Sequence, residues 1–153
     1  MPTPSPKHPI VVQLLEAPFE PLELLAAWQR SLGAAGTAAE SHFIGRVRPT
    51  TASGEPLEAL ELEHYPGMSE AQLRALAGAC AARHGAGAVL VAHRVGRIAP
   101  GEAIVLVAVQ ADRRGPALRC VQELLEDLKH HAPFWKREWS GGSGTWVAGN
   151  TPL

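Results

Sequence analysis

The amino-acid sequence predicts a single α+β domain in which an antiparallel sheet packs against helices. Apolar residues recur at helical spacing in three segments, whereas other segments are dense in valine or alternate between apolar and charged residues. These segments do not follow the regular strand–helix–strand order of a parallel sheet. We expect the domain to span residues 10–148, between a disordered proline-rich tail at 1–9 and a short tail at 149–153.

The first half of the chain is expected to contain three strands and one helix. Pro21 suits a first helical position and Gly33 suits a C-terminal cap. On a strand, Phe43 and Val47 would share one face, and Arg46 and Arg48 would project together on the opposite face. The predicted order is a strand at 10–15, a helix at 21–32, a loop at 33–39, a strand at 42–48, an exposed and mobile loop at 49–56, and a half-buried strand at 57–65.

The second half is expected to contain two helices around an antiparallel hairpin. Ser69 and Gln72 have the spacing of a capping box, so Ser69 should begin a helix that runs to about His84. Pro116 should open the last helix, which ends before Pro133. The remaining predicted elements are strands at 89–95 and 103–109 joined through a turn at 100–101, a turn at 141–144, and a short edge strand at 146–147.

Composition excludes several classes of function. A net charge of -1, with 46% hydrophobic and 19% charged residues, argues against a disordered chain and a general nucleic-acid binder. No apolar run approaches the roughly 20 residues that span a bilayer, and no apolar signal core follows Met1, so we expect a cytosolic protein without membrane contact. Cys80 and Cys120 form no C-x-x-C motif and are expected to be buried thiols. Adjacent His130 and His131 cannot share a metal, so we expect neither a metal site nor a cofactor.

The distribution of lysine is the sharpest compositional signal. Only three of the 14 basic residues are lysines, and Lys129 and Lys136 lie in one short segment, K-H-H-A-P-F-W-K-R-E. A lysine amine can lose its proton, whereas a guanidinium stays charged. We expect a rigid Pro-Phe-Trp corner to orient both amines, and a neighbouring cation such as Arg137 to lower a lysine pKa. The residues alone leave an alternative open, in which this segment is an ordinary amphipathic helix end and Phe134 and Trp135 are core residues.

A second group of basic residues suggests an anion site. Arg113 and Arg114 precede the last predicted helix, where free backbone N–H groups and the helix dipole favour negative charge. With Arg48 from another strand they could bind a phosphate. Each arginine taken singly is more often an ordinary surface charge.

Four motifs together resemble those of the molybdopterin synthase large subunits. They are F-I-G-R-V-R (43–48), L-E-H-Y-P-G-M (62–68), H-R-V-G-R-I-A-P-G-E (93–102) and A-P-F-W-K-R-E (132–138). The resemblance implies an α/β-hammerhead-like fold and a homodimer within a heterotetramer. It also implies a small ubiquitin-like sulfur-carrier partner, whose thiocarboxylated C-terminal Gly-Gly tail supplies sulfur to cyclic pyranopterin monophosphate and so forms the molybdopterin dithiolene.

The resemblance also assigns roles to individual residues. Lys129 would lie beside the terminal glycine of the carrier, and Lys136 would assist sulfur transfer or hold substrate. Arg48 and Arg113, with Arg114 beside them, would bind the phosphate. Asp112 departs from the family pattern, which has histidine there, and would repel a phosphate unless it pairs with Arg114.

Asn150 stands at a second departure, where relatives often carry an arginine that reaches across the dimer. The departures at Asp112 and Asn150 leave open the alternative that the chain is a noncatalytic docking protein for a ubiquitin-like carrier. A third alternative is a domain that binds a phosphate ligand. The retention of both lysines in an arginine-rich chain favours the enzyme.

Overall fold

The computed structural model describes residues 9–131 and 134–147, and it confirms the predicted α+β class. Its helices are α1 (Pro21–Leu32), α2 (Met68–His84) and α3 (Arg114–His131), with a short 3-10 helix, η1, at Gly33–Ala35. Its strands are β1 (Ile10–Leu15), β2 (Ala39–Arg46), β3 (Ala59–Glu63), β4 (Ala88–Arg94), β5 (Gly96–Ile98), β6 (Ala103–Ala111), β7 (Trp135–Ser140) and β8 (Ser143–Trp146).

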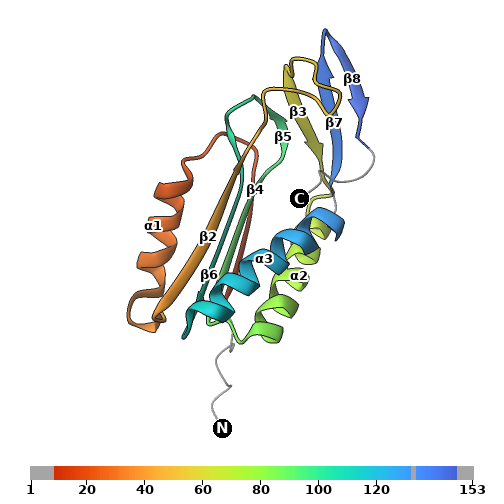
Figure 1. Cartoon of the computed structure of the whole chain (residues 1–153). Helices are drawn as coiled ribbons and strands as arrows, with labels where there is room; N and C mark the ends of the chain where they lie inside the picture. The colour runs from red at the N-terminus through yellow and green to blue at the C-terminus, as the bar shows by residue number, and fades with distance from the viewer. Residues whose placement is uncertain (1–8, 132–133, 148–153) are drawn as a thin grey trace.

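The larger sheet forms the middle of a three-layer arrangement. Its strand order is β1-β4-β6-β2; β1 runs parallel to β4, and the other two pairs are antiparallel. Helix α1 covers one face of this sheet, and α2 and α3 lie side by side on the other (Figure 1). The predicted antiparallel pairing of β4 with β6 is therefore confirmed.

The central strands are buried on both faces, as their sequences require. In β4, Val89 and Val91 pack in the cluster beneath α2 and α3, whereas Leu90 packs in the cluster beneath α1. In β6, Val107 and Leu106 divide between the two clusters in the same way. Because side chains alternate across a strand, a continuous apolar run supplies both cores at once.

A smaller antiparallel sheet projects beyond one end of the larger one. Its strand order is β5-β3-β7-β8 (Figure 1). Val47, Leu57, Leu62 and Ile98 form its core, and Phe134 packs against both this core and the one beneath α2 and α3. The junction between the two sheets is therefore closed by Phe134, which lies two residues before Lys136.

The H-R-V-G-R-I-A-P-G-E motif forms the connection between β4 and β6. The buried guanidinium of Arg94 pairs with Glu102 at 2.8 Å and also donates to the carbonyl oxygen of Arg97. The hydrogen bond from Arg94 lowers the pKa of Glu102. Gly96 and Gly101 have φ values of 83° and 84°, which L side chains rarely adopt. The motif therefore fixes a compact turn that includes β5, a strand that the sequence did not predict.

The strand predicted in the middle of the chain is wrong in detail. The strand expected at 42–48 is β2, which ends at Arg46 because the register shifts between Gly45 and Arg46. The alternation is therefore broken, and Phe43 is exposed while Val47 is buried. The segment predicted as an exposed loop at 49–56 is a loop with residues 52–56 exposed; Thr50 bridges to Pro56, and the backbone N–H of Ala52 donates to the Glu138 carboxylate.

The predicted capping box does not form. Helix α2 begins at Met68 with Gly67 as its N-cap, and the Ser69 hydroxyl accepts a hydrogen bond from the backbone N–H of Tyr65. The Gln72 amide instead donates to the carbonyl oxygen of His131 at 3.2 Å. Gln72 thus joins α2 to the end of α3, whereas Ser69 bonds locally to the segment before α2, and neither side chain completes the predicted reciprocal cap.

The C-terminal part contains more strand than expected. Helix α3 begins at Arg114 rather than Pro116, and residues 135–140 form β7 where only a rigid corner was predicted. The predicted edge strand is β8 at Ser143–Trp146, and the backbone N–H of Val147 still bonds to the carbonyl of Lys136.

Of the predicted tails, only Pro9 is described. Its carbonyl accepts a hydrogen bond from Val89, so Pro9 is tied to the sheet. Residues 1–8 and 149–153 lie outside the described residues, as do Pro133 of the expected corner and Ala148 at the predicted domain boundary. None of the described helices is long and apolar enough to cross a membrane.

Candidate active site

Lys129 and Lys136 reach the same site from two different elements. Lys129 lies in the last turn of α3, directly after the buried Leu128, and its side chain is exposed. Lys136 is the second residue of β7, which pairs with β3. The ammonium of Lys129 is close enough to lower the pKa of Lys136 electrostatically. The prediction that one short segment brings the two amines together therefore agrees with the structure.

Lys136 is half-buried. Because side chains alternate along β7, Phe134 and Lys136 share one face of the strand. Burial lowers the pKa of Lys136 from its ordinary value, and the charge of Lys129 lowers it further, whereas Glu138 acts in the opposite direction. The site thus holds an amine whose proton is lost more readily than that of an exposed lysine.

His93 forms the buried wall of this site, a role that the sequence did not predict. It lies in β4, with its ring 4.5 Å from the ring of Phe134 and its Nδ1 2.8 Å from the carbonyl oxygen of Arg94. Burial lowers the pKa of His93 to about 4; the hydrogen bond to Arg94 opposes that shift, and the charge of Lys136 adds to it. His93 is therefore neutral near pH 7, and Nδ1 is the donor to the carbonyl.

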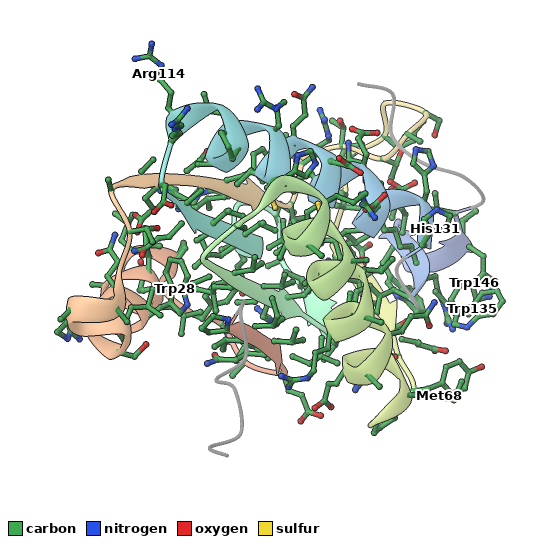
Figure 2. All side chains as sticks on the ribbon, turned by 90° about the horizontal axis from the view of Figure 1, so that it is seen from below. Trp28, Met68, Arg114, His131, Trp135 and Trp146 are labelled. Atoms are coloured by element: carbon green, nitrogen blue, oxygen red, sulfur yellow. The ribbon has the colours of Figure 1, made fainter. Side chains whose placement is uncertain are left out.

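Three large apolar side chains are exposed at the end of the molecule that carries the lysines. Tyr65, Met68 and Trp135 are 56%, 70% and 59% exposed, and they come from the β3–α2 connection, the start of α2 and the start of β7. Figure 2 shows Met68, Trp135 and His131 on the same side of the molecule, opposite the side that carries Arg114. Exposed large apolar side chains that gather beside polar groups are typical of a protein-binding surface.

Arg137 does not take the role predicted for it. It follows Lys136 in β7 and so lies on the opposite face of the strand. Its guanidinium lies 4.0 Å from the centre of the Trp146 ring and 5.3 Å from that of Trp139, and it pairs with Glu61 at 3.5 Å. Among the described residues, the cation that lowers the pKa of Lys136 is Lys129.

Arg48 lies at the same end of the molecule as the lysines. Arg46 at the end of β2 pairs with Ala103 at the start of β6, and Val47 packs in the core that Phe134 joins. Arg48 follows directly and is exposed. Its position is therefore compatible with the expected contact to an anion beside the lysine pair.

Arg113 and Arg114 lie at the other end. They line a shallow hollow at the start of α3, together with Asp112, Pro116 and Arg119, and Asp112 forms no ion pair with Arg114 in the described part of the chain. Fifteen residues separate Arg114 from Lys129 along α3, or roughly 22 Å at about 1.5 Å per residue. Figure 2 shows Arg114 and His131 at opposite ends of the helix. One chain therefore does not bring these arginines and the lysines into one pocket.

The site has the features of an acid–base or group-transfer enzyme. It combines a titratable amine, a second cation, a neutral buried imidazole and an adjoining apolar surface. Within the described residues, the functional groups of the lysine site come from β4, α3 and β7, so rigid elements rather than loops position them. Fold and site thus define an α+β subunit suited to proton transfer next to an anionic reactant.

Comparisons with known proteins identify the family. The model of the MoaE protein family matches residues 14–131. A "Molybdopterin synthase catalytic subunit" of Cereibacter sphaeroides is 42% identical over 130 residues, which cover 84% of this chain and 87% of the relative. The chain therefore belongs to the MoaE family of molybdopterin synthase catalytic subunits, which confirms the predicted family and the predicted sulfurtransferase function.

Solved structures agree with this assignment. A "Molybdopterin biosynthesis MoaE protein" from Burkholderia ambifaria superposes with a TM-score of 0.76 at 32% identity, covering 93% of this chain and 91% of that one. A "Protein-protein complex of subunit 1 and 2 of Molybdopterin-converting factor" from Helicobacter pylori contains a chain with the same fold. Its TM-score is 0.74 at 22% identity, and the match covers 89% of each chain.

Proposed function

We propose that this subunit works in the cytosol, where it transfers sulfur from the thiocarboxylated C-terminus of a small ubiquitin-like carrier to cyclic pyranopterin monophosphate. In this proposal Lys129 contacts the carrier's terminal glycine and Lys136 moves a proton during sulfur transfer. The observation that carries the proposal is the lowered pKa of Lys136 beside Lys129. A thiocarboxylate and a phosphate are both anionic, so two neighbouring cations, one of them titratable, suit this pair of reactants.

The apolar surface beside the lysines supports a carrier partner. An extended Gly-Gly tail has no side chains, so it can approach Lys129 closely, and Tyr65, Met68 and Trp135 are exposed for contact with the rest of the carrier. The Helicobacter pylori structure described above is, by its title, a complex of two subunits. The exposed aromatic and methionine side chains would anchor the body of the partner near the reacting end of its tail.

The arginine positions support a homodimer in which two chains build each site. Because Arg113 and Arg114 lie far from the lysines of their own chain, they can bind the substrate phosphate only at the site of a second copy. Phe43 is 43% exposed on the edge strand β2, and Leu118 is 59% exposed on α3. Ile44 packs in the core beneath α1, so its neighbour Phe43 faces the other side of the sheet, where α3 lies. Phe43 and Leu118 can therefore contribute to one dimer interface that is formed by β2 and α3.

Reconstitution of the reaction tests the proposal. The purified chain is combined with a thiocarboxylated carrier and the cyclic precursor, and molybdopterin formation is measured. Lys129→Ala should abolish product while leaving the circular dichroism spectrum unchanged. Arg48→Ala should mainly raise the apparent KM, because it removes a phosphate contact.

Arg30→Ala is the matched control, since Arg30 lies in the last turn of α1, on the opposite side of the sheet from the lysines' helix. Normal turnover of Lys129→Ala would contradict the catalytic role of Lys129. A wild-type chain that binds the carrier but never forms molybdopterin would favour the docking-protein alternative.

A further inference from the structure

Four side chains with metal-binding chemistry meet between α2 and α3, away from the lysine site. Cys80 and His84 are four residues apart on α2, and Cys120 and Glu123 are three residues apart on α3. Such spacings place each pair on one face of its helix. The two faces point toward each other, since the Cys120 thiol donates to Cys80 and His84 contacts the Glu123 carboxylate.

The separations of the ligand atoms suit a single small cation. The Sγ of Cys80, a ring nitrogen of His84 and a carboxylate oxygen of Glu123 lie within 4.8 Å of one another. The sulfurs of Cys80 and Cys120 are 3.7 Å apart. Two thiolates on one tetrahedral zinc ion, with Zn–S bonds of about 2.3 Å, stand about 3.8 Å apart. The sulfur pair therefore needs almost no movement, and small rotations of the imidazole and carboxylate complete the set.

Burial and access also fit a bound ion. Both cysteines are fully buried, whereas the side chains of His84 and Glu123 are 17% and 38% exposed. The sulfurs thus form the floor of the cluster, and the histidine and carboxylate form its solvent side. An ion can enter from water by passing between these two side chains.

The surrounding charges orient the carboxylate. Arg83 pairs with the Oε1 of Glu123 at 2.7 Å and with Asp127 at 3.0 Å, so the other oxygen of Glu123 faces His84. The carboxylates of Glu123 and Asp127 face the single guanidinium of Arg83, so the cluster has excess negative charge even before a thiol ionises, and a divalent cation reduces that charge. His84 is the last residue of α2, where the helix dipole also favours a cation.

We propose that Cys80, His84, Cys120 and Glu123 form a structural site for one zinc-class divalent cation that joins α2 to α3. Four protein ligands of two sulfurs, one nitrogen and one oxygen close a tetrahedral shell, which is typical of a structural rather than a catalytic ion. This site is independent of the proposed sulfur transfer.

Cobalt binding tests the site directly. The purified full chain is reduced, freed of metal with a chelator, and titrated anaerobically with Co²⁺. We expect one equivalent to give the intense visible bands of four-coordinate cobalt with a thiolate charge-transfer band in the near ultraviolet, and Zn²⁺ to abolish both. Zn²⁺ should also raise the Tm, because it binds only the folded site.

Matched variants identify the ligands. His84→Ala and Glu123→Gln are expected to weaken Co²⁺ binding more than about tenfold, as loss of even an outer-shell partner commonly does. His42→Ala, which removes an exposed histidine on β2, should leave the titration unchanged. Cys80→Ser should remove most of the charge-transfer band.

Two results would overturn the proposal. One is a weak six-coordinate cobalt spectrum without a sulfur band, and the other is a four-coordinate spectrum that His84→Ala and Glu123→Gln both leave intact. If the reduced chain takes up no metal but mild oxidation joins Cys80 to Cys120, the cysteines are a redox pair instead. Circular dichroism of each variant confirms that it is folded.

Discussion

A lysine that leaves water and faces a second ammonium gives up its proton more readily than an exposed lysine. Lys136 meets both conditions, since it is half-buried on β7 and faces Lys129. Lys129→Gln removes the facing charge but keeps the burial, so the pKa of Lys136 should rise part of the way toward its ordinary value. NMR of isotopically labelled lysine side chains measures this directly, because the chain has only three lysines.

The variant Lys136→Arg identifies the Lys136 signal, because that signal disappears. Lys129→Arg is the control, since it keeps a positive charge and should leave Lys136 near its wild-type pKa. An ordinary pKa for Lys136 in the wild-type chain would remove the basis for proton transfer by this residue.

His93 should make the fold sensitive to acid. Its pKa is about 4 in the folded chain and about 6.5 unfolded, so the unfolded state binds more protons between these values. The stability due to neutral His93 is fully present above pH 6.5 and is lost as the pH falls toward 4, up to about 3 kcal/mol. His93→Asn keeps a donor for the Arg94 carbonyl but cannot become charged.

Urea unfolding at pH 7 and pH 4.5 measures this difference. Between the two pH values, the free energy of unfolding should fall more for the wild-type chain than for His93→Asn. Equal decreases in the two proteins would show that His93 does not titrate on unfolding.

The residues of the lysine site differ in how far the sequence revealed them. Lys129 and Lys136 were predicted because lysine is scarce in this chain and because the motif around them is specific. His93 was missed because a histidine inside a run of valines gives no local signal for what it contacts. Its neighbour Phe134 is 41 residues away in sequence, and only the folding of β4 against the start of β7 brings the rings together.

At the level of elements, prediction succeeded where one physical pattern dominates. The valine-rich β4 and β6 are buried on both faces, and α1 and α3 have regular apolar spacing. The strand β5 has only three residues, and β7, W-K-R-E-W-S, has no apolar alternation. Arg137 stacked between two tryptophans stabilises β7 and β8, and such cation–π contacts have no periodic signature in sequence.

The β7–β8 hairpin depends on the absence of a side chain at Gly144. A Cβ there would lie 2.5 Å from the Cδ of Arg137 and 3.0 Å from the Trp139 ring. Gly144→Ala should therefore disturb the stacked arginine and destabilise the chain by about 1–3 kcal/mol. Gly78→Ala is the opposite case, because a Cβ at this position in α2 meets nothing within 4 Å.

In Gly78→Ala we expect stabilisation of about 0.5–1 kcal/mol, since alanine has the higher helix propensity. Thermal unfolding of both variants should shift the Tm in opposite directions. A Tm for Gly144→Ala at or above that of the wild-type chain would show that the hairpin tolerates a side chain there.

At the scale of the whole molecule, the two halves of the predicted site separate along α3. The resemblance implied that the lysines and the arginines act on one substrate, and periodicity fixed the helix that joins them. Neither the resemblance nor the periodicity could show that Arg114 and Lys129 lie at opposite ends of that helix. The distance between two residues follows from their separation in sequence only when both are known to lie in one continuous helix, and the start of α3 was predicted two residues too late. A shared site therefore requires two chains.

Mixed dimers test whether two chains share a site. The inactive variants Lys129→Ala and Arg113→Ala/Arg114→Ala are coexpressed with different tags, and dimers that carry both tags are isolated. Suppose that each site takes its lysines from one chain and its arginines from the other. One site of the mixed dimer then contains all the substituted residues, and the other site contains only wild-type lysines and arginines. Such dimers should show about half of the wild-type activity, because one of two symmetric sites works.

Mixed dimers of Lys129→Ala with Lys136→Ala are the control. Both lysines belong to one end of the same chain, so each site in this dimer lacks one amine and should stay inactive. An inactive Lys129→Ala and Arg113→Ala/Arg114→Ala dimer would contradict the shared site, because it would mean that the lysines and arginines of one chain serve the same site. Activity in the control dimer would instead mean that Lys129 and Lys136 of one chain serve different sites, against the electrostatic contact between them.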